Sequence, residues 1–347
     1  MELKPYAPEY FDKLLRFIQK EYPERNRIEE LLRYRLYHLP PKETDWQQNA
    51  IIVDDNNEII AANMYLPTRL VIGDETVDGV WSYDTMVTAH FRNSDASVLL
   101  MADTLFRQNC FGLGLSDINT KIQKKIKTRF VGDLASYMRI NLRSTGWLRL
   151  CLGITSIKNW VAKKSENRCL FPETISIGTR NFCRVYDEKA IAEPEGEFWN
   201  RDARIVEFSR SHAFLKKRFL NFPKEYAIYL LTDIEISAET DSNSVYFVCR
   251  VGRLHGIRVL HLVDYRFKLN RPDNFGLILK AAHRLTCQLH LEATVVRCSL
   301  PSLTPILYRH RFLIKKSGTA ITCRIKWPDD YTVFVTSADS DHDFYRE

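Results

Sequence analysis

The residues Met86-Val-Thr-Ala-His-Phe-Arg-Asn-Ser-Asp-Ala-Ser97 join two segments of different pattern. Before them, Gly79–Thr88 is rich in β-branched and aromatic residues, which favour a strand. After them, apolar residues recur at helical spacing from Ser94 to about Gln108. A strand, a polar loop and a helix in immediate succession are typical of α/β proteins. The first-turn N–H groups of such a helix are ready donors for an anion.

Upstream and downstream of this stretch, the same two periodicities predict further elements of a first domain. The expected helices are 11–18, 28–36 and a very basic one at 119–128, and the expected strands are 50–53, 58–71, 111–115 and 134–140.

The second half of the chain repeats much of this order. Its expected helices are 214–220, 273–286 and 304–309, and its expected strands are 226–231, 244–251, 258–265, 293–298 and 319–325. A chain of 347 residues exceeds the size at which a single core stops growing. We therefore expect a first domain at 1–145, an interdomain segment with an amphipathic helix at 146–199, and a second domain at 200–347.

The composition suits a cytoplasmic protein. None of the eight cysteines forms a C-x-x-C pair, which is typical of reduced thiols. We expect neither a signal peptide, a membrane-spanning helix nor a metal site. The formal net charge of +7 fits a protein that binds phosphate groups, CoA, nucleic acid or an anionic membrane surface, and it fits a solvated basic surface equally well.

Several short motifs resemble those of the GCN5-related N-acetyltransferases (GNATs). The stretch 86–97 resembles the family's central strand and its phosphate loop, with Arg92 at the first loop position. In the second half, 214–226, 262–265 and Trp327 with 338–341 resemble elements of tandem GNAT proteins found with cell-surface polysaccharide biosynthesis genes. The resemblance implies an α/β (α+β) fold of two tandem GNAT-like domains, each a mixed, mainly antiparallel sheet flanked by helices.

The resemblance also implies an activity and a donor site. The expected reaction is transfer of an acyl group from acetyl-CoA or another acyl-CoA to an amino sugar or other small amine. The residues placed at the donor are Val87, Arg92, Asn93, Ser94, Ala96, Ser97 and Asn119. Asp95 stands where the family has its first loop glycine, and 266–270 in the second half holds no glycine, so we expect a degenerate second domain.

Two residues are candidates for proton transfer. Asp84 lies on the strand that lines the expected site and is the candidate base, although a strand-edge Asp bonded to backbone fits as well. A regular strand would turn Tyr83 to the opposite face, unless a bulge intervenes. Lys125 stands where many GNAT enzymes carry a tyrosine that protonates the departing thiolate. Asn119 fits a helix cap, and Asp339 fits a solvated tail.

Three alternatives stay open on the sequence. A Fem-type transferase that uses aminoacyl-tRNA would fit the missing glycines and the positive charge. A non-catalytic tandem GNAT scaffold would fit the altered loops. The basic, apolar segment 147–164 fits an interdomain helix or a helix lying on a membrane surface.

Overall fold

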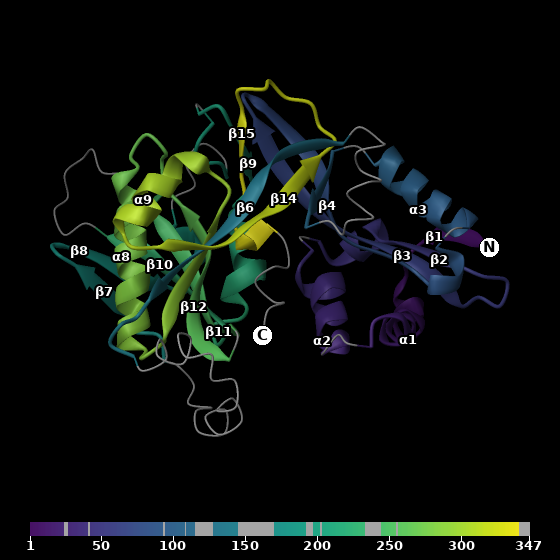
Figure 1. Ribbon diagram of the computed structural model, residues 1–347, viewed down its shortest axis with the longest axis horizontal. Coiled ribbons are helices and arrows are strands. Elements are labelled where there is room, and N and C mark those ends of the chain that lie inside the picture. The colour runs from purple at the N-terminus through teal and green to yellow at the C-terminus, as the bar shows by residue number, and fades with distance from the viewer. Residues whose placement is uncertain are drawn as a thin grey trace. The chain divides into compact units, whose positions relative to one another are not determined.

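The structure is a computed structural model of the whole chain, drawn in Figure 1. It describes all residues except 24–26, 41, 93, 108, 115–127, 145–169, 192–196, 202, 233–243, 255 and 340–347. The chain forms two compact units. Unit 1 comprises Met1–Gly132 and Thr319–Thr332, and unit 2 comprises Asp133–Gly318 and Val333–Glu347.

The sheet of unit 1 is antiparallel except at one pair of strands. Its strands, in sheet order, are β1 (Glu2–Pro5), β2 (Ala50–Val53), β3 (Ile59–Ile72), β4 (Glu75–Val87), β5 (Cys110–Leu113) and the end of β14 (Leu313–Cys323). The pair β4–β5 is parallel. Its helices are α1 (Phe11–Glu21), α2 (Ile28–Arg33) and α3 (Asp95–Phe106), with the π-helical turn η2 (Tyr34–His38) and the 3₁₀ turns η1 (Pro8–Tyr10), η3 (Glu43–Gln48) and η4 (Ala89–Phe91).

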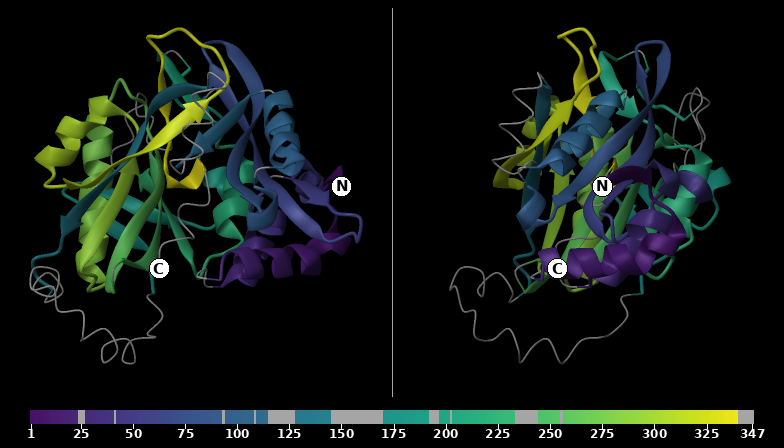
Figure 2. Two further views of the ribbon diagram at one scale, coloured as in Figure 1. Left: turned by 45° about the vertical axis from the view of Figure 1, so that its right-hand side comes forward. Right: turned by 90° about the vertical axis from the view of Figure 1, so that its right-hand side faces the viewer.

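Helices cover both faces of this sheet (Figure 2). Apolar residues of α1 and α2 pack on one face, where Ile51 and Met64 point. Ala96 and Leu100 of α3 pack on the other face, against Ile52 and Ala61. The alternation of buried residues along β2 and β3 therefore supplies two cores, one for each layer of helices.

Unit 2 repeats this layered design with a larger sheet. Its strands, in sheet order, are β6 (Arg129–Ile140, from Asp133 on), β13 (Ala293–Cys298), β12 (Ile257–Arg266), β11 (Tyr246–Leu254), β10 (Tyr226–Thr232), β8 (Arg180–Val185) and β7 (Thr174–Ile177). The pair β12–β13 is parallel. Strand β9 (Ile205–Phe208) pairs with β15 (Thr332–Phe334).

The helices of unit 2 also lie on both faces of its sheet. They are α7 (His212–Leu215), α8 (Asp273–Gln288) and α9 (Thr304–Arg309), with the π-helical turn η7 (Lys216–Leu220) and the 3₁₀ turns η6 (Glu188–Ala190), η9 (Pro301–Leu303) and η10 (Ser337–Asp339). The long helix α8 packs on the face that carries Phe247 and Leu260. Leu215 and Phe219 of α7 and η7 pack on the other face, with Val248.

The expected α/β class, with mixed and mainly antiparallel sheets flanked by helices, is confirmed. The compact units differ from the expected domain limits in three places: residues 133–145 and the described part of the expected interdomain segment 146–199 group with unit 2, and 319–332 group with unit 1. Residues 119–127 of the expected basic helix and the whole segment 147–164 lie outside the described residues. None of the described helices is long and apolar enough to cross a membrane.

Candidate functional site

Strand β4 carries a β-bulge at the residue before Asp84. Along β3, Met64 lies opposite Asp84 and Tyr65 lies opposite Ser82, so Tyr83 is an extra residue in β4. The parallel pairing of β4 with β5 ends at Ser82, whereas β4 itself runs on to Val87. The bulge therefore stands where the two strands part, and bulges of this kind recur beside active sites.

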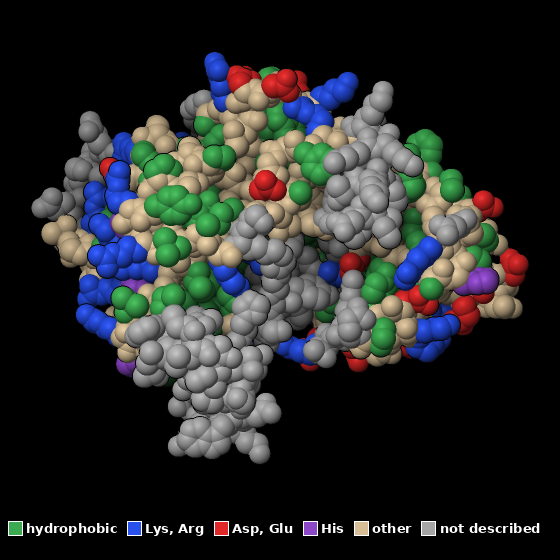
Figure 3. All heavy atoms as spheres, in the orientation of Figure 1, with side chains coloured by type: hydrophobic (Ala, Val, Ile, Leu, Met, Phe, Trp, Pro, Cys, Tyr) green, Lys and Arg blue, Asp and Glu red, His purple; other side chains and the backbone are tan. Residues whose placement is uncertain are grey.

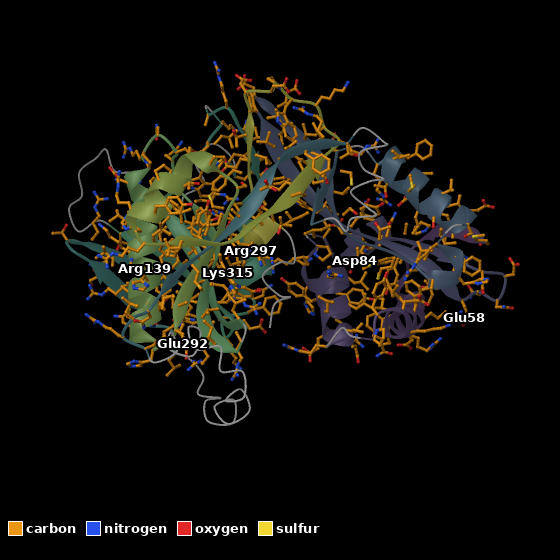
Figure 4. All side chains as sticks on the ribbon, in the orientation of Figure 1. Glu58, Asp84, Arg139, Glu292, Arg297 and Lys315 are labelled. Carbon is orange, nitrogen blue, oxygen red and sulfur yellow. The ribbon has the colours of Figure 1, made fainter. Side chains whose placement is uncertain are left out.

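Asp84 lies on the face of unit 1 that α1 and α2 cover. Asp84, labelled in Figure 4, forms an ion pair with Arg35 from η2, the turn that continues α2. The Asp84 side chain is 15% exposed, and that of Arg35 is 7% exposed. Asp84 is thus a carboxylate held by a buried guanidinium, with part of its surface still accessible.

The expected phosphate loop is closed by its own side chains. Ser94 is the N-cap of α3, and its Oγ accepts the N–H of Ala96 at 3.3 Å. Ser97 Oγ donates to the carbonyl oxygen of Arg92 at 2.5 Å. The Arg92 side chain is exposed and bonds back to the Val87 carbonyl oxygen at 3.4 Å. An anion at this helix start would therefore be met first by the Arg92 guanidinium.

The structure brings six of the nine candidate residues into unit 1 around β4 and the first turn of α3. Val87 ends β4, and Ala96, a residue of α3, is buried where this helix packs on the sheet. The other three, Asn93, Asn119 and Lys125, lie outside the described residues. Asp84 faces the helices α1 and α2 while the loop belongs to the α3 side, so the two candidate groups flank the bulge from opposite faces.

Unit 2 contains the same bulge at the same place in its own sheet. Val248 of β11 lies opposite Asp264, and Cys249 lies opposite Leu262, so Val263 is the extra residue of β12. The parallel pairing of β12 with β13 ends at Leu262. Asp264 follows the bulge just as Asp84 does in unit 1.

Asp264 is fully buried, and its carboxylate is saturated with donors. Arg210 binds it through two N–H groups, at 2.8 and 3.1 Å. The remaining donors are Arg266 Nη1 at 3.0 Å, Thr336 Oγ1 at 2.8 Å and Tyr246 OH at 3.1 Å. A carboxylate offers about four lone-pair positions, so Asp264 has none left for a substrate amine.

The C-terminal segment completes this network, which corrects the expectation of a solvated tail for Asp339. Asp339 is buried, and its Oδ1 accepts from Arg210 Nη2 at 2.7 Å. Its other oxygen accepts the N–H of Thr336 at 2.8 Å. Two buried arginines therefore hold three buried carboxylates, the third of which is Glu207, with its Oε1 3.5 Å from Arg266 Nε.

The pKa values of two carboxyl groups in this network shift in opposite directions. Burial alone would raise the pKa of Asp264, but the charges of Arg210 and Arg266 outweigh it and lower that pKa. For Glu207, burial dominates over Arg266 and raises the pKa. Asp264 is accordingly the ionised centre of the network and a structural group.

Unit 2 also holds a pocket of about 630 Å³ at the start of α8. Its lining comes from β8, β10, the residue before β11, the loop before α8, α8 itself and α9. The lining residues are Arg180, Leu231, Val245, Asn270, Arg271, Pro272, Asp273, Asn274, Gly276, Leu277, Lys280, Ile306, Arg309 and His310. Four of these carry a permanent positive charge and Asp273 alone carries a negative one.

Sequence reasoning missed the arginine partners and this pocket. A signal exists for Arg35 alone: Leu32-Arg-Tyr-Arg35-Leu-Tyr-His-Leu-Pro40 and Leu215-Lys-Lys-Arg218-Phe-Leu-Asn-Phe-Pro223 match in pattern, and each places a buried arginine in a π-helical turn. Arg210 and Arg266, the arginines that hold Asp264, lie outside this pattern. The pocket residues come from distant segments of the chain, so no local sequence pattern predicts that they form a pocket.

Comparison with solved structures identifies the fold. A GCN5-related N-acetyltransferase from Anabaena variabilis matches with a TM-score of 0.57 at 12% identity, over 93% of this chain and 72% of that one. The chain has the GNAT fold. A probable N-acyltransferase from Enterococcus faecalis matches with a TM-score of 0.56 at 9% identity, over 93% and 72% of the two chains.

A third match extends the likeness to another acyltransferase. N-myristoyltransferase of Saccharomyces cerevisiae, solved with bound myristoyl-CoA, matches with a TM-score of 0.55 at 12% identity, over 94% of this chain and 83% of that one. No family model and no curated protein sequence matches the chain. At these identities the likeness establishes the fold, and the chemistry has to come from the residues.

Proposed function

We propose that the chain is an acyl-CoA-dependent N-acyltransferase whose transfer centre lies in unit 1. One observation carries the proposal: β4 and β5 part at a bulge, and the next residue is a partly accessible carboxylate held by an arginine. The matched structures include named acetyltransferases and an acyltransferase with bound myristoyl-CoA, which supports an acyl-CoA as the donor.

In this proposal the acyl-CoA donor and the amine bind on opposite sides of the bulge. The donor approaches from the side of α3, with its phosphates at the exposed Arg92 and the first turn capped by Ser94. The amine approaches from the side of Asp84. The backbone at Tyr83 stands outside the β3–β4 register, so its N–H is placed to polarise the thioester carbonyl.

The reaction then needs two proton transfers. The amine nitrogen attacks the thioester carbonyl carbon, and the carbon–sulfur bond breaks as the amide forms. Asp84 takes a proton from the amine nitrogen as that nitrogen attacks, directly or through one water, while Arg35 fixes the carboxylate in place. In this proposal Lys125 returns a proton to the departing thiolate.

The acceptor is an amino sugar or another small amine, in a role such as surface polysaccharide biosynthesis. A small acceptor suits a carboxylate of which only 15% is exposed, because a bulky surface could not reach it. Unit 2 does not catalyse transfer, since Asp264 is saturated by its own chain.

Titration with acetyl-CoA and longer acyl-CoAs by calorimetry tests this proposal. Arg92→Ala removes one charged contact to phosphate and should weaken acyl-CoA binding by about tenfold. Arg284→Ala in unit 2, an exposed residue of α8 outside the pocket lining, is the matched control and should leave that affinity unchanged. Failure of every acyl-CoA to bind would refute the proposal.

A further inference from the structure

We propose that unit 2 carries a second binding site, separate from the transfer centre, for a small molecule that bears a diphosphate group. The site is the pocket at the start of α8. This inference goes beyond the proposed acyl transfer, and it rests on the proposed function only for the location of the acyl-CoA.

The pocket combines an apolar floor with a cationic rim. Leu231 of β10 and Val245 are buried at its base. The exposed side chains of Arg271, Lys280 and Arg309 stand around it, from three different segments. A floor of this kind suits the organic part of a ligand, and converging cations suit its phosphates.

These cations are available to a ligand. Within the described residues, Arg271, Lys280 and Arg309 form no ion pair. Lys and Arg side chains also gather over this part of unit 2 in Figure 3. Unneutralised charges that converge on one hollow raise the local concentration of anions.

The helix that borders the pocket has a start without a side-chain cap. Pro272 is the N-cap of α8 and offers no side-chain acceptor, in contrast to Ser94 at α3. Helix α8 has 16 residues, so its positive dipole end is fully developed. Asp273 in the first turn offsets part of this field.

Gly276 leaves room for the imidazole of His310 beside the first turn of α8. A Cβ atom added at Gly276 would lie 2.8 Å from His310 Nε2, so only glycine leaves the imidazole in its place. Burial and the charges of Lys280, Arg139 and Arg309 lower the pKa of His310. A bound anion would offset these charges, so His310 is positioned to gain a proton and a charge as the ligand binds.

The pocket cannot serve as the donor site of an acyl transfer in unit 2, because the aspartate at the bulge of this unit is already saturated. Arg210, Arg266 and the C-terminal residues Thr336 and Asp339 fill the place beside Asp264. A phosphate ligand held at α8 therefore has no free carboxylate at the bulge of its own unit. The pocket is suited to binding, for recognition or regulation.

The experiment uses the full-length protein, with inorganic pyrophosphate, ADP and acetyl-CoA as separate probes in calorimetry. We expect pyrophosphate and ADP to bind once per chain, and Lys280→Ala with Arg309→Ala to weaken both by about tenfold or more. Arg284→Ala on α8, an exposed residue outside the pocket lining, is the matched control and should bind as the wild type does.

Three results would overturn the inference. Absence of pyrophosphate and ADP binding would remove the site. Binding of tRNA or anionic vesicles that depends on Lys280 and Arg309, without binding of either small probe, would assign the surface to a macromolecule. Loss of acetyl-CoA binding in the Lys280→Ala, Arg309→Ala variant, with normal binding in Arg92→Ala, would make the pocket the acyl-CoA site and refute the assignment to unit 1 as well.

Discussion

Asp84 and Asp264 occupy equivalent positions: each directly follows the extra residue of a β-bulge, at the point where a parallel strand pair ends. Their surroundings differ. The side chain of Asp84 is 15% exposed and bonds to Arg35, whereas Asp264 is 0% exposed and bonds to two arginines, a tyrosine and a threonine. One site is open to a substrate, and the other is part of the core.

Replacing Arg35 by alanine should destabilise unit 1. The substitution leaves the Asp84 carboxylate without its guanidinium in a nearly buried place, which costs about 2–4 kcal/mol in the free energy of unfolding. Urea unfolding measures the effect. The double variant Arg35→Met with Asp84→Leu should recover most of the loss, and a double variant as unstable as Arg35→Ala would show that the pair is not its source.

Asp264 should make the stability of the protein depend on acidity. Its pKa in the folded state lies below its ordinary value, because Arg210 and Arg266 outweigh the effect of burial. The ordinary value is about 3.9, so the contribution of Asp264 is present above about pH 4 and is lost as the pH falls through the folded pKa. Asp264→Asn should cost about 3–5 kcal/mol at neutral pH. Urea unfolding from pH 7 to pH 3 should show this deficit shrink towards acid.

Glu207→Gln provides a comparison of opposite sign. Burial raises the pKa of Glu207, so the folded state favours its protonated form, and that contribution is lost as the pH rises through the folded pKa. The stability of the wild type relative to this variant should therefore fall as the pH rises. Parallel pH profiles for the Asp264→Asn and Glu207→Gln variants would contradict the two assignments.

Gly79 should tolerate no side chain. A Cβ atom at this position would lie 2.8 Å from the carbonyl oxygen of Asn109, which is backbone and cannot rotate away. Gly79→Ala should thus cost about 1–3 kcal/mol, measured by the thermal midpoint. Gly178→Ala, where a Cβ would meet nothing within 4 Å but the φ angle is +63°, separates backbone strain from crowding. A smaller loss at Gly79 than at Gly178 would speak against the crowding.

Binding of pyrophosphate should take up a proton at His310. The pKa of this imidazole is lowered in the free protein by burial and then by Lys280, Arg139 and Arg309, and an anion relieves the effect of these charges. The affinity of the wild type relative to that of His310→Gln should therefore rise as the pH falls from 8 to 6, because the ligand's own titration acts on both proteins alike. Calorimetry in buffers of different ionisation enthalpy counts the protons. Equal pH slopes in the two proteins would exclude His310 as the proton acceptor.

The sequence predicted most of the regular structure because its hydrophobic periods are strong. The expected strand 50–53 and helices 273–286 and 304–309 agree with β2, α8 and α9 within two residues. Arg92, Ser94 and Ser97 do meet at the first turn of α3, because they are neighbours in the chain.

Contacts between distant segments could not be predicted in this way. The polar local sequence of Asp339 predicts a solvated residue, yet Arg210, 129 positions away, binds its carboxylate in the core of unit 2. The bulge at Tyr83 needed the register of β3, and the pocket needed four elements to converge. Local patterns record periodicity, whereas these features depend on tertiary packing.

Hydrogen–deuterium exchange with and without acetyl-CoA tests the central claim, that acyl transfer belongs to unit 1. We predict slower exchange in peptides that cover 79–106, which hold the bulge of β4 and the start of α3, and unchanged exchange in 257–266, which holds the bulge of β12. Protection of 257–266 with no change in 79–106 would contradict the claim, because the acyl-CoA would then lie at the bulge whose aspartate is saturated.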